Sequence, residues 1–225
     1  MAFILHIDTA LQKAFVGISE NGTLLHEAKS DNPMNHAAFV QPAIQEILKT
    51  SGLSLNKIDA VGVTGGPGSY TGLRVAMSSA KGLCYVLQKP LLTVSTLQAL
   101  AYAAIDSFPG YDMYCPMIDA RRNEVFTALY DEEVNILADP HALILEPSSF
   151  TANLKKGTVL FFGNGAAKWQ QLIAPDSNAY FKVVEYDGRH LSHLLFKSFI
   201  NKDFKDLAYT EPSYLKDFYL GNKTV

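Results

Sequence analysis

The sequence predicts an α/β fold made of two similar lobes, each a mixed sheet with helices. Short apolar runs alternate with helical patterns along the 225 residues, which is typical of sheets covered by helices. An internal repeat divides the chain into two halves. Hydrophobic residues make up 48% of the sequence and charged residues 18%, a composition that supports a real core and argues against disorder.

The repeat is found when the chain is displaced by 111 positions, and such repeats can decide a fold assignment. Five matches in one ungapped register favour a duplication over chance. Two lobes that face each other would place Asp8 and Asp119 at one cleft. The matched pairs are Ile7 with Ile118, Asp8 with Asp119, Phe15 with Phe126, Ile18 with Leu129, and Glu20 with Asp131.

The first half opens with three antiparallel strands, because Asn21 and Gly22 form a hairpin signal between two apolar runs. Its first helix contains Pro42 and ends at Gly52. The predicted elements are strands at 3–7, 14–18, 23–27, 58–63 and 90–94, and helices at 34–49, 73–87 and 95–105. A break at Phe108 and Pro109 sets the lobe boundary, so we predict an N-terminal lobe at 1–108 and a C-terminal lobe at 109–225.

The second half repeats the strand, aspartate and hairpin unit. A second glycine turn at 163–166 precedes a helix that contains Trp169. The aromatic tail at 209–220 is expected to pack back across a lobe or onto another chain. The predicted strands are 113–118, 125–130, 142–145, 159–162 and 182–186, and the other helices are 147–156 and 190–200.

The most informative stretch is GGPGSYTGLR, residues 65–74, between a strand and a helix. Glycine lets a backbone approach a ligand or another chain closely, and N–H groups at a helix start can bind an anion. Neither the G-K-[ST] ending of a P-loop nor the G-x-G-x-x-G spacing of a dinucleotide site is present. From spacing alone, a tight turn that binds nothing is an equal alternative to a ligand loop.

Charge and composition restrict the class of protein. Lys and Arg number 19 against 22 Asp and Glu, a net charge of −3 that does not favour a chain that grips nucleic acid by itself. Cys84 and Cys115 stand in no C-x-x-C, which suits buried thiols in a reducing compartment. There is no basic n-region and no apolar run near the roughly 20 residues that span a bilayer. We therefore expect a cytoplasmic protein that does not contact membranes.

Three blocks of the sequence, ILHIDTA, GPGSYTGLRVA and MIDARRNEVFTALY, together resemble the TsaB family, also called YeaZ. The match is strongest over about the first 130 residues, and PAIQEIL is similar to the first long helix of the family. The resemblance implies a bacterial protein with the duplicated, ribonuclease H-like fold of actin, Hsp70 and sugar kinases. It also implies a role in threonylcarbamoylation of the adenosine beside the anticodon of ANN-decoding tRNAs.

The resemblance further implies a noncatalytic scaffold or activating subunit. Members of the family pair with a larger homologue, TsaD, which holds the metal and performs the transfer. A small ATPase, TsaE, joins the complex, and a separate enzyme, TsaC, makes the threonylcarbamoyl-adenylate. Contact with tRNA is expected through the complex, and a homodimer is expected when TsaD is absent. No cofactor of its own is expected, and ATP or ADP only at the interface with partner subunits.

Two departures from related patterns favour a noncatalytic role. TsaD-like proteins carry an H-x-x-x-H metal pair on the first long helix, whereas His36 is followed here by Val40. An actin-type phosphate loop has Asp-x-Gly, whereas Asp8 and Thr9 are followed here by Ala10. We therefore expect no metal site and no independent ATP hydrolysis.

Two sets of residues are candidates for function, and none is predicted to be catalytic. By resemblance, the helices at about 34–50 and 72–88 form the interface with TsaD. The interface candidates are His36, Phe39, Val40, Val75, Ser78, Ser79, Gly82 and Val86. The candidates for the glycine turn and ligand contact are Asp8, Thr9, Gly66, Pro67, Gly68, Ser69, Tyr70, Thr71, Gly72, Arg74 and Asp119.

Two enzymatic alternatives remain open. The first is an ATPase or small-molecule kinase of the actin-like class with a degenerate site, which would use Asp8, Asp119 and the two glycine turns. The second is the glycoprotease activity historically attached to this fold group. For a protease, the sequence offers neither a metal pair nor an activated nucleophile.

Overall fold

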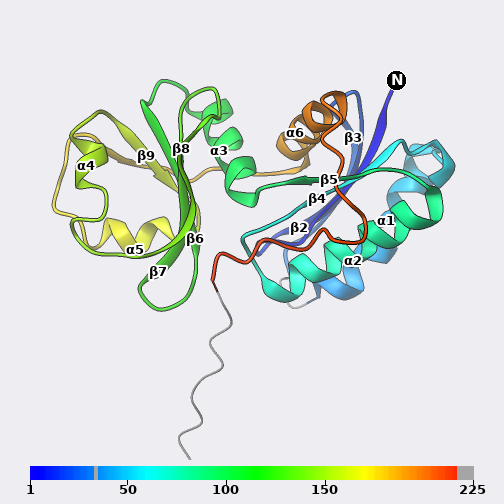
Figure 1. The fold of residues 1–225 in the computed structure, drawn as a ribbon, viewed down its shortest axis with the longest axis horizontal. Coiled ribbons are helices and arrows are strands. Elements are labelled where there is room, and N and C mark those ends of the chain that lie inside the picture. Colours follow the sequence, from blue (N-terminus) through cyan, green and yellow to red (C-terminus); the bar gives the residue numbers. More distant parts are fainter. Residues whose placement is uncertain (33–34, 217–225) are drawn as a thin grey trace, which may run out of the picture.

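Two five-stranded mixed sheets form the molecule, as the computed structural model shows for residues 1–32 and 35–216 (Figure 1). The strands of the first sheet are β1 (Phe3–Asp8), β2 (Ala14–Glu20), β3 (Thr23–Ser30), β4 (Ala60–Thr64) and β5 (Leu91–Val94). Their order is β3-β2-β1-β4-β5. The first three strands are antiparallel, and β4 and β5 continue the sheet in parallel with β1.

The second sheet repeats the topology of the first. Its strands are β6 (Met113–Asp119), β7 (Glu124–Tyr130), β8 (Ile136–Ile144), β9 (Val159–Phe162) and β10 (Ala179–Phe181). Their order is β10-β9-β6-β7-β8, which is the same succession read from the opposite edge. The predicted duplicated α/β fold is therefore confirmed.

Helices cover both faces of each sheet, and the lobes exchange one helix. The long helices of the first lobe are α1 (His36–Ser51) and α2 (Tyr70–Leu87), and a single 3-10 turn (Leu55–Lys57) lies between them. The helices that follow β5 and β10 are α3 (Thr96–Ser107) and α6 (Gly188–Ile200). α3 packs on β6 and β7 of the second sheet, and α6 packs on the first sheet. Figure 1 shows both helices between the two sheets.

The second lobe keeps two short helices on its outer face, α4 (Thr151–Leu154) and α5 (Ala166–Gln170). They pack on β6 and β9 around Trp169, which is fully buried. Because α3 and α6 cross over, the two halves share their central layer. The boundary at residue 108 stays a prediction, since the elements on either side of it are packed together.

Side-chain faces test the repeat residue by residue. On the second strands, Phe15 and Phe126 both face the exchanged helix, whereas Ile18 and Leu129 both face the helices of their own lobe. Alternate side chains of a strand point to opposite faces, so agreement in face means agreement in register. These two pairs are confirmed.

The first strands do not follow the same displacement. Asp8 is the cross-strand partner of Phe15, while Ile118 is the partner of Phe126. Asp8 therefore corresponds to Ile118, and the predicted pairing of Asp8 with Asp119 is wrong by one residue. Because one residue changes the face of the sheet, the two carboxylates point to opposite sides of their sheets.

Two predicted strands differ from the structure. Residues 182–186 form no strand, because after Phe181 the chain leaves the edge of the second sheet to carry α6 onto the first. β8 begins at Ile136 rather than at residue 142, and it includes Pro140. β8 is an edge strand with an irregular register, which is where a sheet tolerates proline.

The tail crosses from the first lobe to the second. Lys205 bridges to Leu91 of β5, and Lys81 of α2 donates hydrogen bonds to the carbonyls of Ala208 and Thr210. Lys216 then forms an ion pair with Glu124 of β7. The tail thus packs on the N-terminal lobe over residues 205–214 and reaches the second lobe at residues 215–216, while residues 217–220 lie outside the described residues. In the described part of the chain, no helix has both the length and the apolar character to cross a bilayer.

Candidate functional site

The glycine turn joins β4 to α2 as predicted. Ser69 is the N-cap of α2, and its hydroxyl accepts a hydrogen bond from the Gly72 N–H at 3.2 Å. Gly66 has a φ of 105°, which only glycine adopts readily. Glycine is therefore required by backbone conformation at the start of this turn.

The turn between β1 and β2 docks directly onto the glycine turn. The Ser69 N–H donates to the Ala10 carbonyl at 2.7 Å, and the Thr9 hydroxyl donates to the Gly72 carbonyl at 2.6 Å. A Cβ at Gly68 would lie 3.0 Å from the Ala10 carbonyl carbon, and one at Gly72 would overlap the Thr9 carbonyl oxygen. The close approach that these glycines allow is thus taken up by the chain itself.

The tail and α3 cover the other side of the same turn. The Ser213 N–H donates to the Gly65 carbonyl at 2.7 Å, and the Thr96 N–H donates to the Gly66 carbonyl at 2.9 Å. A Cβ at Gly66 would come within 2.7 Å of the Ser213 carbonyl oxygen. Protein backbone thus lies against two sides of the turn, while Ser69, Tyr70 and Thr71 at the start of α2 are exposed.

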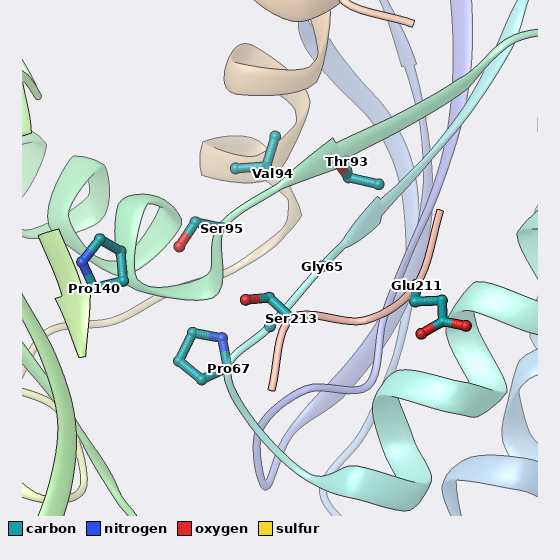
Figure 2. Close-up of a pocket in the computed structure, with 9 residues that line it drawn as sticks. Gly65, Pro67, Thr93, Val94, Ser95, Pro140, Glu211 and Ser213 are labelled. Atoms are coloured by element: carbon teal, nitrogen blue, oxygen red, sulfur yellow. The ribbon is translucent and has the colours of Figure 1, made fainter. Parts of the chain in front are cut away.

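A small cavity remains beside the turn, between the lobes (Figure 2). Its volume is about 210 Å³, below the 300–1,000 Å³ or so of typical ligand pockets. The residues around it come from the turn, the end of β5, the start of α3, β8 and the tail: Gly65, Pro67, Val94, Ser95, Pro140, Glu211 and Ser213.

Asp8 is fully buried at the end of β1. Its carboxylate accepts hydrogen bonds from the Ala10 N–H at 2.8 Å and from the Tyr186 hydroxyl at 2.7 Å. Burial raises the pKa of Asp8 above its ordinary value, although these two bonds oppose the rise. Tyr186 comes from the segment that leads into α6, so Asp8 acts as a structural link between the two halves.

Asp119 lies in a different environment, at the exposed end of β6. Its carboxylate accepts a hydrogen bond from Lys168 of α5 at 2.6 Å and one from the Arg121 N–H at 2.7 Å. Partial burial opposes ionisation, but these bonds outweigh it and hold the pKa of Asp119 below its ordinary value. Within the described residues, no hydrogen bond or ion pair joins Asp119 to Asp8. The two carboxylates that the kinase hypothesis needs therefore have separate hydrogen-bond partners.

Arg74 and Tyr70 lie on the first turns of α2, next to the tail. The Arg74 guanidinium stands 4.0 Å from the centre of the Tyr70 ring, and its Nε donates to the Tyr214 hydroxyl at 3.1 Å. The two tyrosine rings are 5.2 Å apart. Thr71, in the same turn, is exposed. Arg74 therefore ties the tail to α2.

The outer faces of α1 and α2 form one surface, and Gln41 donates a hydrogen bond to Ser79 across it at 3.3 Å. Ser78, Gly82 and Val86 are exposed on it, and nothing lies within 4 Å of a Cβ placed at Gly82. The exposed fractions of Tyr85 and Val86 are 71% and 77%, large for apolar side chains. Phe39, Val75 and Ser79 are half-buried at its base.

Two of the predicted interface residues do not reach this surface. Val40 is completely buried in the core between α1, α2 and the first sheet. His36 is also buried, and its Nε2 lies 3.2 Å from the Gln12 carbonyl. The prediction that these two contact a partner is wrong, because helical spacing places them on the inward face of α1.

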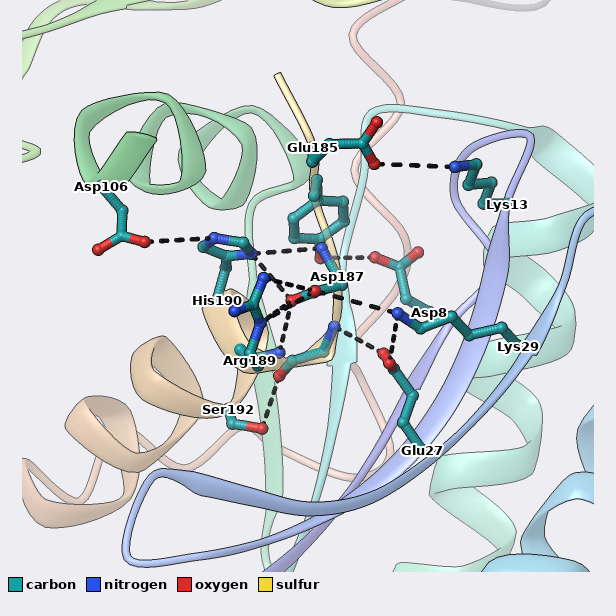
Figure 3. A network of polar contacts seen from close by, with 12 residues as sticks. Asp8, Lys13, Glu27, Lys29, Asp106, Glu185, Asp187, Arg189, His190 and Ser192 are labelled. Carbon is teal, nitrogen blue, oxygen red and sulfur yellow. Dashed lines mark hydrogen bonds and ion pairs between the residues drawn. The ribbon is translucent and has the colours of Figure 1, made fainter. Parts of the chain in front are cut away.

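A polar network lies under the start of α6, and of the predicted site residues it includes Asp8 (Figure 3). Asp187 caps α6, and Glu27 accepts a hydrogen bond from the Gly188 N–H at 2.7 Å. His6 of β1 lies behind it, 3.4 Å from the Ser192 hydroxyl, and burial lowers its pKa to about 3. The only sequence signal for this network is a histidine inside an apolar strand. Among the described residues, no group of three or more His, Cys, Asp or Glu could hold a metal ion.

Comparisons with known proteins agree with this architecture. A family model of tRNA N6-adenosine threonylcarbamoyltransferase, TsaD, matches residues 30–215. The tRNA threonylcarbamoyladenosine biosynthesis protein TsaB of Escherichia coli is 32% identical over 173 residues, which is 75% of this chain and 74% of that protein. The chain belongs to the TsaB family. The TsaB protein of Bacillus subtilis is 30% identical, over 76% of this chain and 74% of its own.

Solved structures support the same family and fold. A Pseudomonas aeruginosa protein described as similar to peptidase YeaZ has a TM-score of 0.82 and 25% identity, over 96% of this chain and 100% of that one. A polyphosphate/ATP-glucomannokinase from Arthrobacter has a TM-score of 0.50 at 12% identity, which shows the sugar-kinase type of fold alone.

The TsaB-family chain matches transferases over a smaller share of their length. The tRNA N6-adenosine threonylcarbamoyltransferase of Symbiobacterium thermophilum is 36% identical over 92 residues, which is 40% of this chain and 27% of that protein. The chain is thus similar to about a quarter of that transferase and to about three quarters of the two TsaB proteins.

Proposed function

We propose that this chain is a noncatalytic scaffold or activating subunit of the complex that makes threonylcarbamoyladenosine in tRNA. The observation that carries the proposal is which residues lie on the inward face of α1. Where a metal pair would need two histidines facing a cleft, His36 contacts the Gln12 carbonyl and Val40 is buried in the core. The enzymatic alternatives find no support in the glycine turn, whose sides are occupied by backbone.

The partner in this proposal is a TsaD-type transferase, bound by the exposed faces of α1 and α2. Small residues at Ser78 and Gly82 let another helix approach closely, and the exposed Tyr85 and Val86 supply apolar area. The same surface would form a homodimer when the transferase is absent. A TsaE-type ATPase and the tRNA would join through the assembled complex in the cytoplasm.

Nucleotide, in this proposal, binds at junctions with the partner subunits and not within the chain. The cavity beside the glycine turn is smaller than typical ligand pockets, and the Asp8 carboxylate accepts a hydrogen bond from Tyr186. The chain would therefore contribute surface rather than a phosphate loop.

Gly82→Arg tests the proposed interface. A Cβ at this position meets open space, and arginine favours a helix more than glycine does, so the isolated chain should stay folded. Co-elution with the transferase should be lost, whereas Lys57→Ala, at an exposed position outside both helices, should leave it intact. Wild-type affinity of the Gly82→Arg variant would refute this interface.

A further inference from the structure

The turn between β6 and β7 carries two adjacent arginines in an unusual backbone conformation. Arg121 has a φ of 70° and Arg122 a φ of 48°, both in the left-handed region. This region is disfavoured for side chains with a Cβ, and asparagine or glycine is the ordinary choice in such a hairpin. The turn therefore carries arginines where local stability favours other residues.

The rest of the lobe holds this turn in place. Lys168 of α5 donates hydrogen bonds of 2.6 Å to both the Asp119 carboxylate and the Arg122 carbonyl. The same carboxylate accepts the Arg121 N–H at 2.7 Å. A strained backbone conformation persists only when the surrounding structure holds it, and the hydrogen bonds from Lys168 hold this one.

Both guanidinium groups are free on the outside of the turn. Arg121 and Arg122 are exposed, and within residues 1–32 and 35–216 neither side chain takes part in a hydrogen bond or ion pair. The acidic residues that flank them are already paired, Asp119 with Lys168 and Glu124 with Lys216. The turn is thus a local positive site on a chain whose net charge is −3.

The backbone of the turn adds further donors. Across the described residues, no hydrogen bond is formed by the N–H groups of Arg122 and Asn123. Successive free N–H groups in a turn form a concavity that suits an anion. Guanidinium groups bind phosphate with two parallel hydrogen bonds, which distinguishes them from lysine. The chemistry of the turn therefore matches phosphate groups.

We propose that the β6–β7 turn binds backbone phosphates of the tRNA on which the complex acts. This inference rests on the proposed function, which brings tRNA to the complex. The turn lies in the lobe of β6 and β7, whereas the helices α1 and α2, which the proposed function assigns to the protein partner, lie on the other lobe (Figure 1). Phosphate contacts would position the RNA rather than read its sequence.

The test compares two charge-matched double variants in the complex with the transferase. Arg121→Asn/Arg122→Gly relieves the backbone strain and removes both guanidiniums. Lys155→Gln/Lys156→Gln removes two exposed charges elsewhere on the same lobe. For each complex, tRNA affinity is measured over a series of salt concentrations, together with co-elution of the subunits and the thermal midpoint of the isolated chain.

We expect the arginine variant to keep the transferase and to unfold about 4 °C higher than the wild type. Its complex should bind tRNA about 10-fold more weakly near 0.15 M salt, and the slope of log affinity against log salt should fall by about 2. The lysine variant should match the wild type in affinity and slope.

Unchanged tRNA affinity and slope in the arginine variant, with the transferase still bound, would overturn this inference and leave the proposed function standing. Loss of the transferase from that variant would also overturn it, because the arginines would then serve a protein partner. Failure of the wild-type chain to bind the transferase would refute the proposed function, and the inference with it.

Discussion

Gly72→Ala tests whether the glycine turn exists to receive the chain's own backbone. A Cβ at Gly72 would overlap the Thr9 carbonyl oxygen and lie 3.0 Å from its carbonyl carbon, where backbone cannot easily yield. Overpacking costs about 1–3 kcal/mol, and loss of the hydrogen bond from the Thr9 hydroxyl adds about 1 kcal/mol. The gain in helix propensity, about 1 kcal/mol, offsets part of this. We expect a net loss of about 2 kcal/mol.

Gly82→Ala is the matched control, because it makes the same substitution in the same helix where the new Cβ meets open space. It should gain about 1 kcal/mol from helix propensity alone. Denaturant unfolding of both variants should therefore place them about 3 kcal/mol apart, with wild type between them. If Gly72→Ala proves as stable as Gly82→Ala, the turn does not dock as described.

The remaining predictions concern buried titratable groups. Because burial raises the pKa of Asp8, the folded chain keeps a proton on this carboxyl above about pH 3.8, where the unfolded chain has lost it. The free energy of unfolding therefore falls as the pH rises from about 3.8 toward the raised pKa. Asp8→Asn should therefore gain more stability at pH 7 than at pH 4 while the reconstituted complex keeps its activity; loss of activity would give Asp8 a chemical role. His6 has the opposite sign: with its pKa lowered to about 3, the folded chain binds fewer protons, so stability falls on acidification below about 6.5. Between pH 7 and pH 5 the wild type should lose about 2 kcal/mol more than His6→Gln does, and equal losses would contradict burial of a neutral ring.

Local patterns in the sequence predict most of this fold. Apolar runs and helix caps locate nearly every element, and Asn21 and Gly22 take the positive φ angles that their hairpin needs. The exchange of α3 and α6 could not be predicted in this way, because it depends on which sheet each apolar face meets. The same exchange explains why residues 182–186 form no strand: they cross between the sheets.

The site shows the same division between local and distant information. The glycine turn is predicted between a strand and a helix from its own residues, and the structure confirms it, with Ser69 as the N-cap of α2. The hydrogen bond between Tyr186 and Asp8 joins residues 178 positions apart, and no sequence pattern near Asp8 predicts it. A one-residue error in the repeat register was enough to place Asp119 on the wrong face. Periodicity along one strand cannot reveal such an error when both faces are buried.

Reconstitution of the transferase reaction tests the central claim most directly. The TsaD-type transferase, with threonylcarbamoyl-adenylate and tRNA, would be assayed alone, with the wild-type chain and with the Gly82→Arg variant. The proposed scaffold role predicts modified tRNA only with the wild-type chain. Equal activity of the transferase with and without the chain would contradict it.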